Sequence, residues 1–201
     1  MSLGGIVVAA GRGERFGRTK AGVEVGGIPM WQRATRLLEA AGAGRVVVVG
    51  EVPGGVAGGA RRRDSVANGM AALGDGLEYV LIHDAARPLA STTLAGRVVA
   101  RLRRGDVDGV IPVVPVRDTL KRVAGERVEG TVDRSRLAAA QTPQGFRFAV
   151  LAAAQEADSD DAGDEAALIE RAGGSVVTVP GDPANLKVTY PEDLAVIEAL
   201  R

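Results

Sequence analysis

Short apolar runs alternate with longer amphipathic stretches along most of this chain. Each run is rich in β-branched residues and is bounded by glycine, proline or charged positions, which is typical of buried strands. We therefore predict strands at 5–10, 45–50, 78–83, 108–114 and 175–180. Helices are predicted between and after them, at 28–41, 61–73, 91–104, 146–157, 163–171 and 191–200. This alternation predicts a single α/β domain over residues 1–201, with a mainly parallel sheet and helices on both of its faces.

Capping residues support several of these helix boundaries. Pro29 stands at the first position of its helix and Gly42 follows the end of that helix. Ser91 is expected to cap the helix that ends near residue 104. Asp64 or Ser65 lies near the start of the helix at 61–73. Helices typically have proline at the first turn, a hydroxyl or carboxylate at the N-terminus and glycine after the last turn.

The pattern changes between residues 115 and 138, where polar and apolar residues alternate around Gly125. This alternation predicts a two-stranded hairpin with one solvated face, which projects from the domain as a β-arm. Because an isolated hairpin is only marginally stable in water, the arm is expected to pack on another surface. That surface is either a second subunit or the arm's own domain.

Composition excludes several classes of function. The 201 residues are 46% hydrophobic, and 25 Lys and Arg balance 25 Asp and Glu, which argues against a general nucleic-acid binder. The absence of cysteine excludes a disulfide framework, a zinc–thiolate site and a thiol nucleophile. No apolar run approaches the roughly 18 residues of a membrane span, and the N-terminus has no signal-like region. We expect a cytoplasmic protein with no membrane partner.

The loop after the first predicted strand interleaves glycines with cations. Its residues of interest are Gly11, Gly13 and Gly17, with Arg12, Arg15, Arg18 and Lys20 between and after them. Glycines allow close backbone approach, so the loop favours a chain of phosphates over a solvated turn without a ligand. The three residues between Gly13 and Gly17 exclude a dinucleotide fingerprint, and the loop lacks the G-K-[ST] of a P-loop.

The third predicted strand ends in the sequence HDAARP at 83–88. Asp84 could accept hydrogen bonds from ligand hydroxyls or hold a divalent cation, with Arg87 as its ion-pair partner. The alternative is a buried Asp–Arg pair that only stabilises the turn. His83 is the only histidine of the chain and is expected to be a packed residue without a functional role.

Two segments near these strands carry further candidates. GGARRRDS at 58–65 could accept a nucleobase or ribose along its backbone, or it could be an exposed basic loop. Arg134 on the returning side of the arm is either a phosphate clamp or an exposed salt-bridge partner.

The last candidates lie in the C-terminal half. Thr142, in the turn QTPQ at 141–144, offers a hydroxyl donor, and Lys187 and Thr189 share one face of the segment NLKVT. The chain has no G-x-S-x-G elbow, no HExxH and no second histidine for a triad. Cations and hydroxyls around a glycine loop suit phosphoryl or nucleotidyl transfer, in which positioning and charge neutralisation supply most of the catalysis.

The chain resembles one family along nearly its whole length. AAGRGERFGRTK, HDAARP, VRDTLKR, LAAAQTPQGF, the DEA at 164–166 and NLKVTYPEDL occur in the order found in the 2-C-methyl-D-erythritol 4-phosphate cytidylyltransferases. The resemblance implies a Rossmann-like α/β domain and a homodimer built through the β-arm. It also implies transfer of CMP from CTP to methylerythritol phosphate with release of pyrophosphate, assisted by magnesium held mainly by the CTP phosphates.

The resemblance further implies roles on the nucleotide side of the site. Arg15 and Lys20 would hold the CTP triphosphate and stabilise the transition state. The cytidine would be lined by Ala9, Ala10, Gly11, Gly59, Ser65 and Ala86. Thr19 replaces a proline that is frequent before the loop lysine, and Ala60 replaces an acidic residue of some members.

On the acceptor side, the family pattern implies that Asp84 holds the acceptor hydroxyls or helps to place the metal, supported by Arg87. Three residues would bind the acceptor from the arm side: Thr119, Thr142 and Arg134. Of these, Thr142 and Arg134 would reach the neighbouring subunit's site. Lys187, with Thr189, would place the attacking phosphate.

Three alternatives remain. A ribitol 5-phosphate cytidylyltransferase shares the fold and most of the motifs. A non-catalytic nucleotide-binding module would be expected to have lost some of the cations, yet Arg15, Lys20, Arg134 and Lys187 are all present. An NAD-dependent oxidoreductase ranks last because the glycine spacing is wrong.

Overall fold

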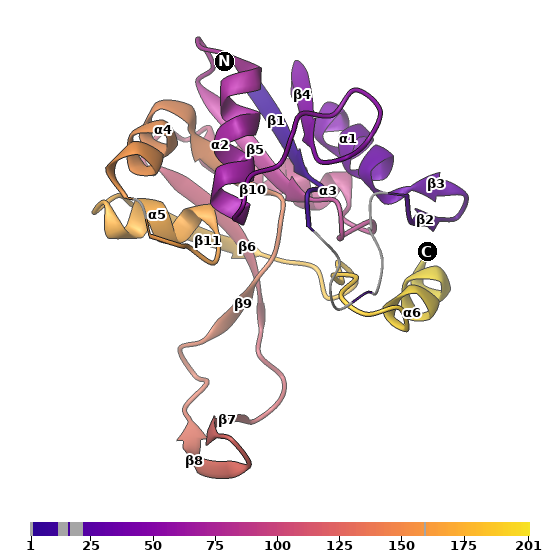
Figure 1. The fold of residues 1–201 in the computed structure, drawn as a ribbon. Coiled ribbons are helices and arrows are strands. Elements are labelled where there is room, and N and C mark those ends of the chain that lie inside the picture. Colours follow the sequence, from indigo (N-terminus) through magenta and orange to yellow (C-terminus); the bar gives the residue numbers. More distant parts are fainter. Residues whose placement is uncertain (1, 12–15, 17–21, 159) are drawn as a thin grey trace.

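A central sheet organises the molecule, and Figure 1 shows helices packed on both of its faces. The structure is a computed structural model and describes residues 2–11, 16, 22–158 and 160–201. The sheet has seven strands in the order β11-β6-β10-β5-β1-β4, with β9 paired to β6. Their bounds are β1 (Leu3–Val8), β4 (Arg45–Val49), β5 (Tyr79–Asp84), β6 (Gly109–Pro115), β9 (Ala138–Ala140), β10 (Gln144–Arg147) and β11 (Val176–Pro180).

Most strands of this sheet run in one direction. β1 is parallel to both β4 and β5, and β11 is parallel to β6. β10 lies antiparallel between β5 and β6, and β9 is antiparallel to β6. The expected mainly parallel sheet is confirmed. The reversed β10 was not predicted, because the pattern of residues 144–147 indicates a polar turn and the start of a helix.

Successive residues of each buried strand point to opposite faces, and each face carries its own helices. Val7 and Leu81 pack with α1 (Met30–Ala40) and α3 (Thr92–Leu102). Ile6 and Ile82 pack with α2 (Arg62–Leu73), α4 (Phe148–Ala157) and α5 (Glu165–Arg171). Burial on both faces explains why the strands appear as continuous apolar runs rather than as an alternation.

A third apolar cluster lies beside the main sheet. It joins Phe16, Val25, Met30, Val188 and Ile197. These residues connect a small hairpin, β2 (Glu24–Val25) and β3 (Ile28–Pro29), to the C-terminal helix α6 (Asp193–Leu200). The cluster therefore ties the end of the chain to the region that follows β1.

The observed helices begin and end within two residues of the predicted boundaries. The Ser91 side chain accepts a hydrogen bond from the Leu94 amide, so the expected cap is confirmed. Pro29 lies in β3 immediately before α1 rather than inside the helix. α2 begins at Arg62, with the Arg61 amide donating to Asp64, and α4 begins at Phe148 rather than at 146.

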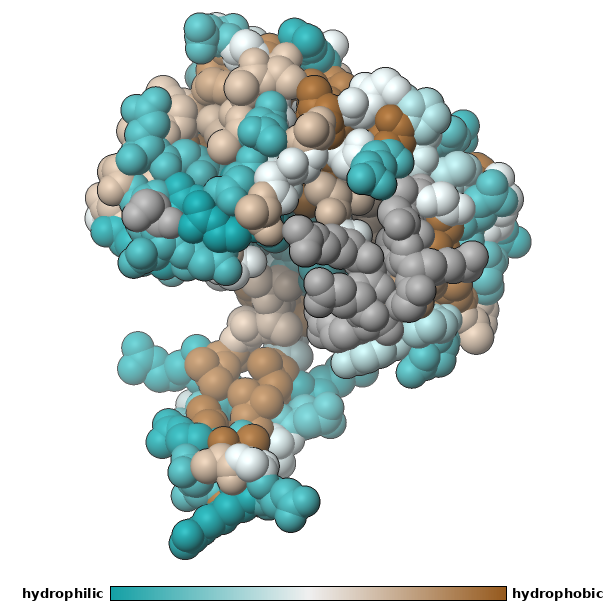
Figure 2. Space-filling view, viewed as in Figure 1, coloured by the Kyte–Doolittle hydropathy of each residue, from teal (hydrophilic) through white to brown (hydrophobic). Residues whose placement is uncertain are grey.

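The inserted arm projects from the body of the domain (Figure 1). Its hairpin consists of β7 (Leu120–Ala124) and β8 (Arg127–Val132), joined at Gly125, which has a positive φ of 57°. Val123 and Val128 face each other in the register, and each is 59% exposed. Figure 2 shows apolar side chains gathered on the arm. The projecting hairpin is confirmed, and the alternative of an arm folded onto its own domain is wrong.

No helix in the described part of the chain is long and apolar enough to cross a membrane.

Candidate active site

The carboxyl ends of β1 and β5 bring together segments that are distant in sequence. Ala9 and Ala10 follow β1, and a Cβ added at Gly58 would lie 2.4 Å from the Ala10 Cβ. The loop before α2 is thus in close contact with the end of β1. The Gly59 amide donates to the Ser65 hydroxyl at 3.0 Å, which shapes this loop from within. The edge of the sheet where parallel strands end is where open α/β folds bind ligands.

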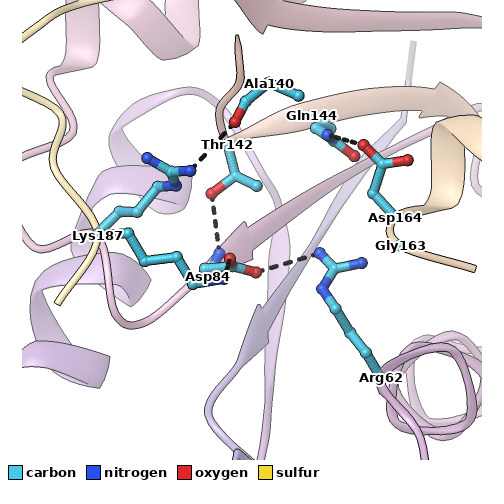
Figure 3. A pocket seen from close by; sticks show the side chains of 9 residues that line it. Arg62, Asp84, Ala140, Thr142, Gln144, Gly163, Asp164 and Lys187 are labelled. Carbon is cyan, nitrogen blue, oxygen red and sulfur yellow. Dashed lines mark hydrogen bonds and ion pairs between the residues drawn. The ribbon is translucent and has the colours of Figure 1, made fainter. Parts of the chain in front are cut away.

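A cavity of about 350 Å³ opens next to these segments (Figure 3). Its size falls in the usual range for small-molecule sites. Cationic and acidic side chains and backbone from several elements surround it, namely Arg62, Asp84, Arg87, Ala140, Thr142, Gln144, Gly163, Asp164 and Lys187. Three cations among these residues favour an anionic ligand.

Asp84, the last residue of β5, is held by two cations. Its Oδ1 accepts from Arg62 Nη2 at 3.2 Å, and its Oδ2 accepts from Lys187 Nζ at 2.7 Å. Burial alone would raise the pKa of Asp84, but the charges of Arg62 and Lys187 outweigh this effect and hold that pKa well below its usual range. The carboxylate is therefore ionised at neutral pH.

Arg62 connects Asp84 to a second carboxylate. Its Nη1 donates to Glu165, whose side chain is only 1% exposed. Burial lowers the pKa of the Arg62 guanidinium, but the two carboxylates raise it above its ordinary value. Sequence reasoning missed both Arg62 and Glu165 as individual site residues. The available signals were the arginine run at 61–63 and the DEA motif at 164–166.

Arg87 does not have its expected partner. Among the described residues, the ion pairs of Asp84 are with Arg62 and Lys187, so the prediction of an Asp84–Arg87 ion pair is wrong. Arg87 donates instead to the carbonyls of Asn185 at 2.8 Å and Ala140 at 3.2 Å. These bonds tie the turn after β5 to two other segments at the rim of the cavity. Burial lowers the pKa of Arg87.

Thr142 lies in the same cavity as Asp84. Its Oγ1 accepts from the Asp84 amide at 3.1 Å and lies 2.8 Å from Nδ1 of His83. The residue is 4% exposed. The resemblance assigned Thr142 to the neighbouring subunit's site, whereas the structure places it beside Asp84 of its own chain. His83 is fully buried, as expected of a packed residue.

Several candidate residues lie apart from this cavity. Thr119 and Arg134 are exposed on the arm, where Arg134 donates to the carbonyls of Val116 and Arg117. Thr189 is not in the cavity wall, and its hydroxyl donates to the Lys187 carbonyl at 3.3 Å. Ala86 borders the turn and accepts at its carbonyl from the Val188 amide. Arg15 and Lys20, with most of the glycine loop after Gly11, lie outside the described residues.

A cation-lined cavity at the carboxyl ends of parallel strands is typical of Rossmann-like enzymes that bind phosphorylated ligands. Residues 3–201 match the family model IspD, 2-C-methyl-D-erythritol 4-phosphate cytidylyltransferase, and the chain belongs to this family. It is therefore a nucleotidyltransferase of the non-mevalonate isoprenoid pathway, as the motifs implied.

Individual relatives cover the chain from end to end. It is 46% identical over 218 residues to the 2-C-methyl-D-erythritol 4-phosphate cytidylyltransferase of Nocardia farcinica, covering 99% of this chain and 94% of that protein. The crystal structure of the Thermus thermophilus protein of the same name has a TM-score of 0.84 and 35% identity, covering 100% of this chain and 98% of that one. The chain is also 42% identical to the bifunctional enzyme IspD/IspF of Solidesulfovibrio magneticus, covering 97% of this chain but 56% of that protein. The Rossmann-like α/β fold is confirmed by these neighbours.

Proposed function

We propose that this chain transfers CMP from CTP to 2-C-methyl-D-erythritol 4-phosphate and releases pyrophosphate. The observation that supports the site assignment is the convergence of Asp84, Thr142 and Lys187 on one cavity, beside the segments assigned to the nucleotide. Family membership supports the reaction class.

In this mechanism, the residues of the cavity position two anions rather than move protons. The phosphate of the acceptor is already ionised at neutral pH, so the attack on the α-phosphate needs no strong base. His83 is unsuited to act as one, because burial lowers its pKa to about 4. Lys187 is proposed to hold the attacking phosphate, and Asp84 and Thr142 to bind acceptor hydroxyls. Holding the reactants in line and neutralising their charge then supplies the rate enhancement.

The nucleotide side of the proposal rests on the loop segments after β1 and before α2. Arg15 and Lys20 are assigned to the triphosphate on the resemblance alone. The contact between Gly58 and Ala10 supports a common nucleotide surface, because it places the two proposed cytidine-binding segments side by side. That surface would consist of Ala9, Ala10, Gly11, Gly59, Ser65 and Ala86.

Magnesium is part of the proposal. In the described residues no group of three or more acidic, histidine or cysteine side chains could hold a metal ion. Both Asp84 oxygens already accept from cations, so the residues present fit an ion that is held mainly by the phosphate oxygens of CTP. When bound, magnesium would neutralise phosphate charge as a Lewis acid.

The arm supports a homodimer. Val123 and Val128 form an exposed apolar pair on a hairpin that projects from the body of the domain. Thr119 and Arg134, exposed on the same arm, are proposed to reach the partner subunit's acceptor site. Since the reaction draws on the CTP pool, we propose that the enzyme works in the cytoplasm.

Pyrophosphate release from CTP and magnesium tests the proposal, with methylerythritol phosphate and ribitol 5-phosphate assayed in parallel. Turnover with the first acceptor only is the expected result. Turnover with ribitol 5-phosphate only would support cytidylyl transfer but show that methylerythritol phosphate is not the acceptor. If neither acceptor reacts although CTP binds, the chain is a nucleotide-binding module. Lys187→Ala should lower turnover, whereas the exposed arginine variant Arg103→Met should retain it.

A further inference from the structure

Four charged side chains form a continuous ion-pair network behind and within the cavity. Lys187 binds Asp84, Asp84 binds Arg62, and Arg62 binds Glu165. Cations and carboxylates alternate along this network, so its formal charges cancel. Lys187 and Arg62 are thus already paired with carboxylates in the cavity, whereas Arg87 donates to carbonyls. An ammonium that leaves its carboxylate can direct all of its three donors to a phosphate.

The two cations of the network are held very differently. Arg62 uses both terminal nitrogens, one for each carboxylate, and its side chain is 23% exposed. It is also the first residue of α2, so its backbone is fixed. Within the described part of the chain, Lys187 makes a single ion pair through a flexible stem, and its side chain is 46% exposed. Lys187 is therefore the cation that can move at lower cost.

The cost of moving Lys187 depends on what remains at Asp84. The Asp84 side chain is only 10% exposed, and a carboxylate this buried is strongly unfavourable without a cationic partner. Arg62 stays at the other oxygen when Lys187 leaves, and Glu165 holds Arg62 in place. Asp84 thus keeps one partner throughout.

We propose that Arg62, anchored by Glu165, is a positioning residue that releases Lys187 from Asp84 to bind the phosphate group of the acceptor. No covalent bond is made or broken in this step, in which an ammonium exchanges one anionic partner for another. The identity of the phosphate ligand rests on the proposed function. The exchange itself requires only a phosphate group of suitable size in the cavity.

The three lysines of the chain, Lys20, Lys121 and Lys187, make this exchange directly observable. Reductive ¹³C-dimethylation labels them without removing their charge, and Lys187→Arg identifies the Lys187 signal. Titration with inorganic phosphate should shift that signal in the wild-type protein. In Arg62→Met the phosphate concentration that half-saturates the shift should rise about tenfold. Among the described residues, Lys187 is then the one ion-pair partner left to Asp84, so it leaves Asp84 less readily. An unchanged titration would overturn the proposal.

A double-mutant cycle separates this role from direct contact of Arg62 with phosphate. Asp84→Asn removes the charge that retains Lys187, so it should improve phosphate binding more in the Arg62→Met background than in the wild-type background. Equal improvement in both backgrounds would mean that Arg62 acts by binding the phosphate itself. Arg62→Gln, which keeps an amide donor for Glu165, replaces Arg62→Met if that variant does not fold. Arg103→Met is the matched control and should titrate like the wild type.

Steady-state kinetics provides the second readout. Arg62→Met should raise KM for methylerythritol phosphate about tenfold and leave KM for CTP within about twofold. Equal increases in both constants would indicate a general structural defect and contradict the proposal. If the wild-type protein does not turn over this acceptor, the proposed function fails, while the Lys187 titration with inorganic phosphate still tests the exchange.

Discussion

His83 should make the stability of this protein depend on pH in a way that a single substitution removes. Burial lowers the pKa of His83 from 6.5 to about 4, with Asp84 opposing and Arg87 reinforcing the effect. Between these values the unfolded chain binds a proton that the folded protein does not bind. Stability therefore falls as pH decreases from about 6.5 to about 4. The two values differ by about 2.5, and each unit corresponds to about 1.36 kcal/mol, so the loss is about 3 kcal/mol.

The chain has one histidine and one tryptophan, which makes the measurement direct. Urea unfolding is followed by the fluorescence of Trp31, which packs against the core, at several values between pH 7.5 and pH 4. The same series is run on His83→Gln, which has no group that titrates there. Carboxylates titrate in both proteins, so the difference between the two curves isolates the histidine. The wild type should lose about 3 kcal/mol more than the variant over this range.

Parallel curves for the two proteins would refute this reasoning, because they would mean that His83 is protonated in the folded protein as readily as in the unfolded one. A difference of opposite sign would indicate that the folded protein stabilises the imidazolium through Asp84 more than burial disfavours it. Either result would also remove the argument that His83 is too weakly basic to take part in the reaction.

Three further predictions concern the site and the arm. Gly58→Ala places a Cβ against Ala10 and should raise KM for CTP about tenfold. The control Gly44→Ala, whose Cβ meets open space, should leave the kinetic constants unchanged. The same KM for CTP in both variants would contradict a shared nucleotide surface. Asp84→Asn should lower kcat by about 10²-fold or more, by analogy with other preorganised charges, in the pyrophosphate assay, and near-full turnover would exclude Asp84 from the acceptor site. Val123→Asp should dissociate the proposed dimer in light scattering after size exclusion, because it puts a charge on the apolar face of the arm; an unchanged mass would reject that interface.

Much of the fold was predictable because its signals are local. The buried strands appear as β-branched runs, Ser91 caps its helix through a hydrogen bond three residues away, and Gly125 supplies the positive φ of the arm's turn. β10 escaped prediction for a physical reason. Its four residues, QGFR, are few and mostly polar or glycine, and they run directly into α4, so no apolar run or alternation marks a strand there.

The types of side chain at the candidate site could be predicted from the sequence, since the cations, the strand end that carries Asp84 and the family motifs are all local features. The partners of these side chains depend on the tertiary structure. Three consecutive arginines have different partners because Arg61 precedes α2, whereas Arg62 and Arg63 are helical residues separated by about 100°. Arg61 bonds Asp64 nearby, Arg63 donates to the carbonyls of Gln155 and Asp160, and Arg62 turns toward Asp84 and Glu165. That choice depends on where the start of α5 lies relative to the start of α2, which no local pattern in the chain encodes.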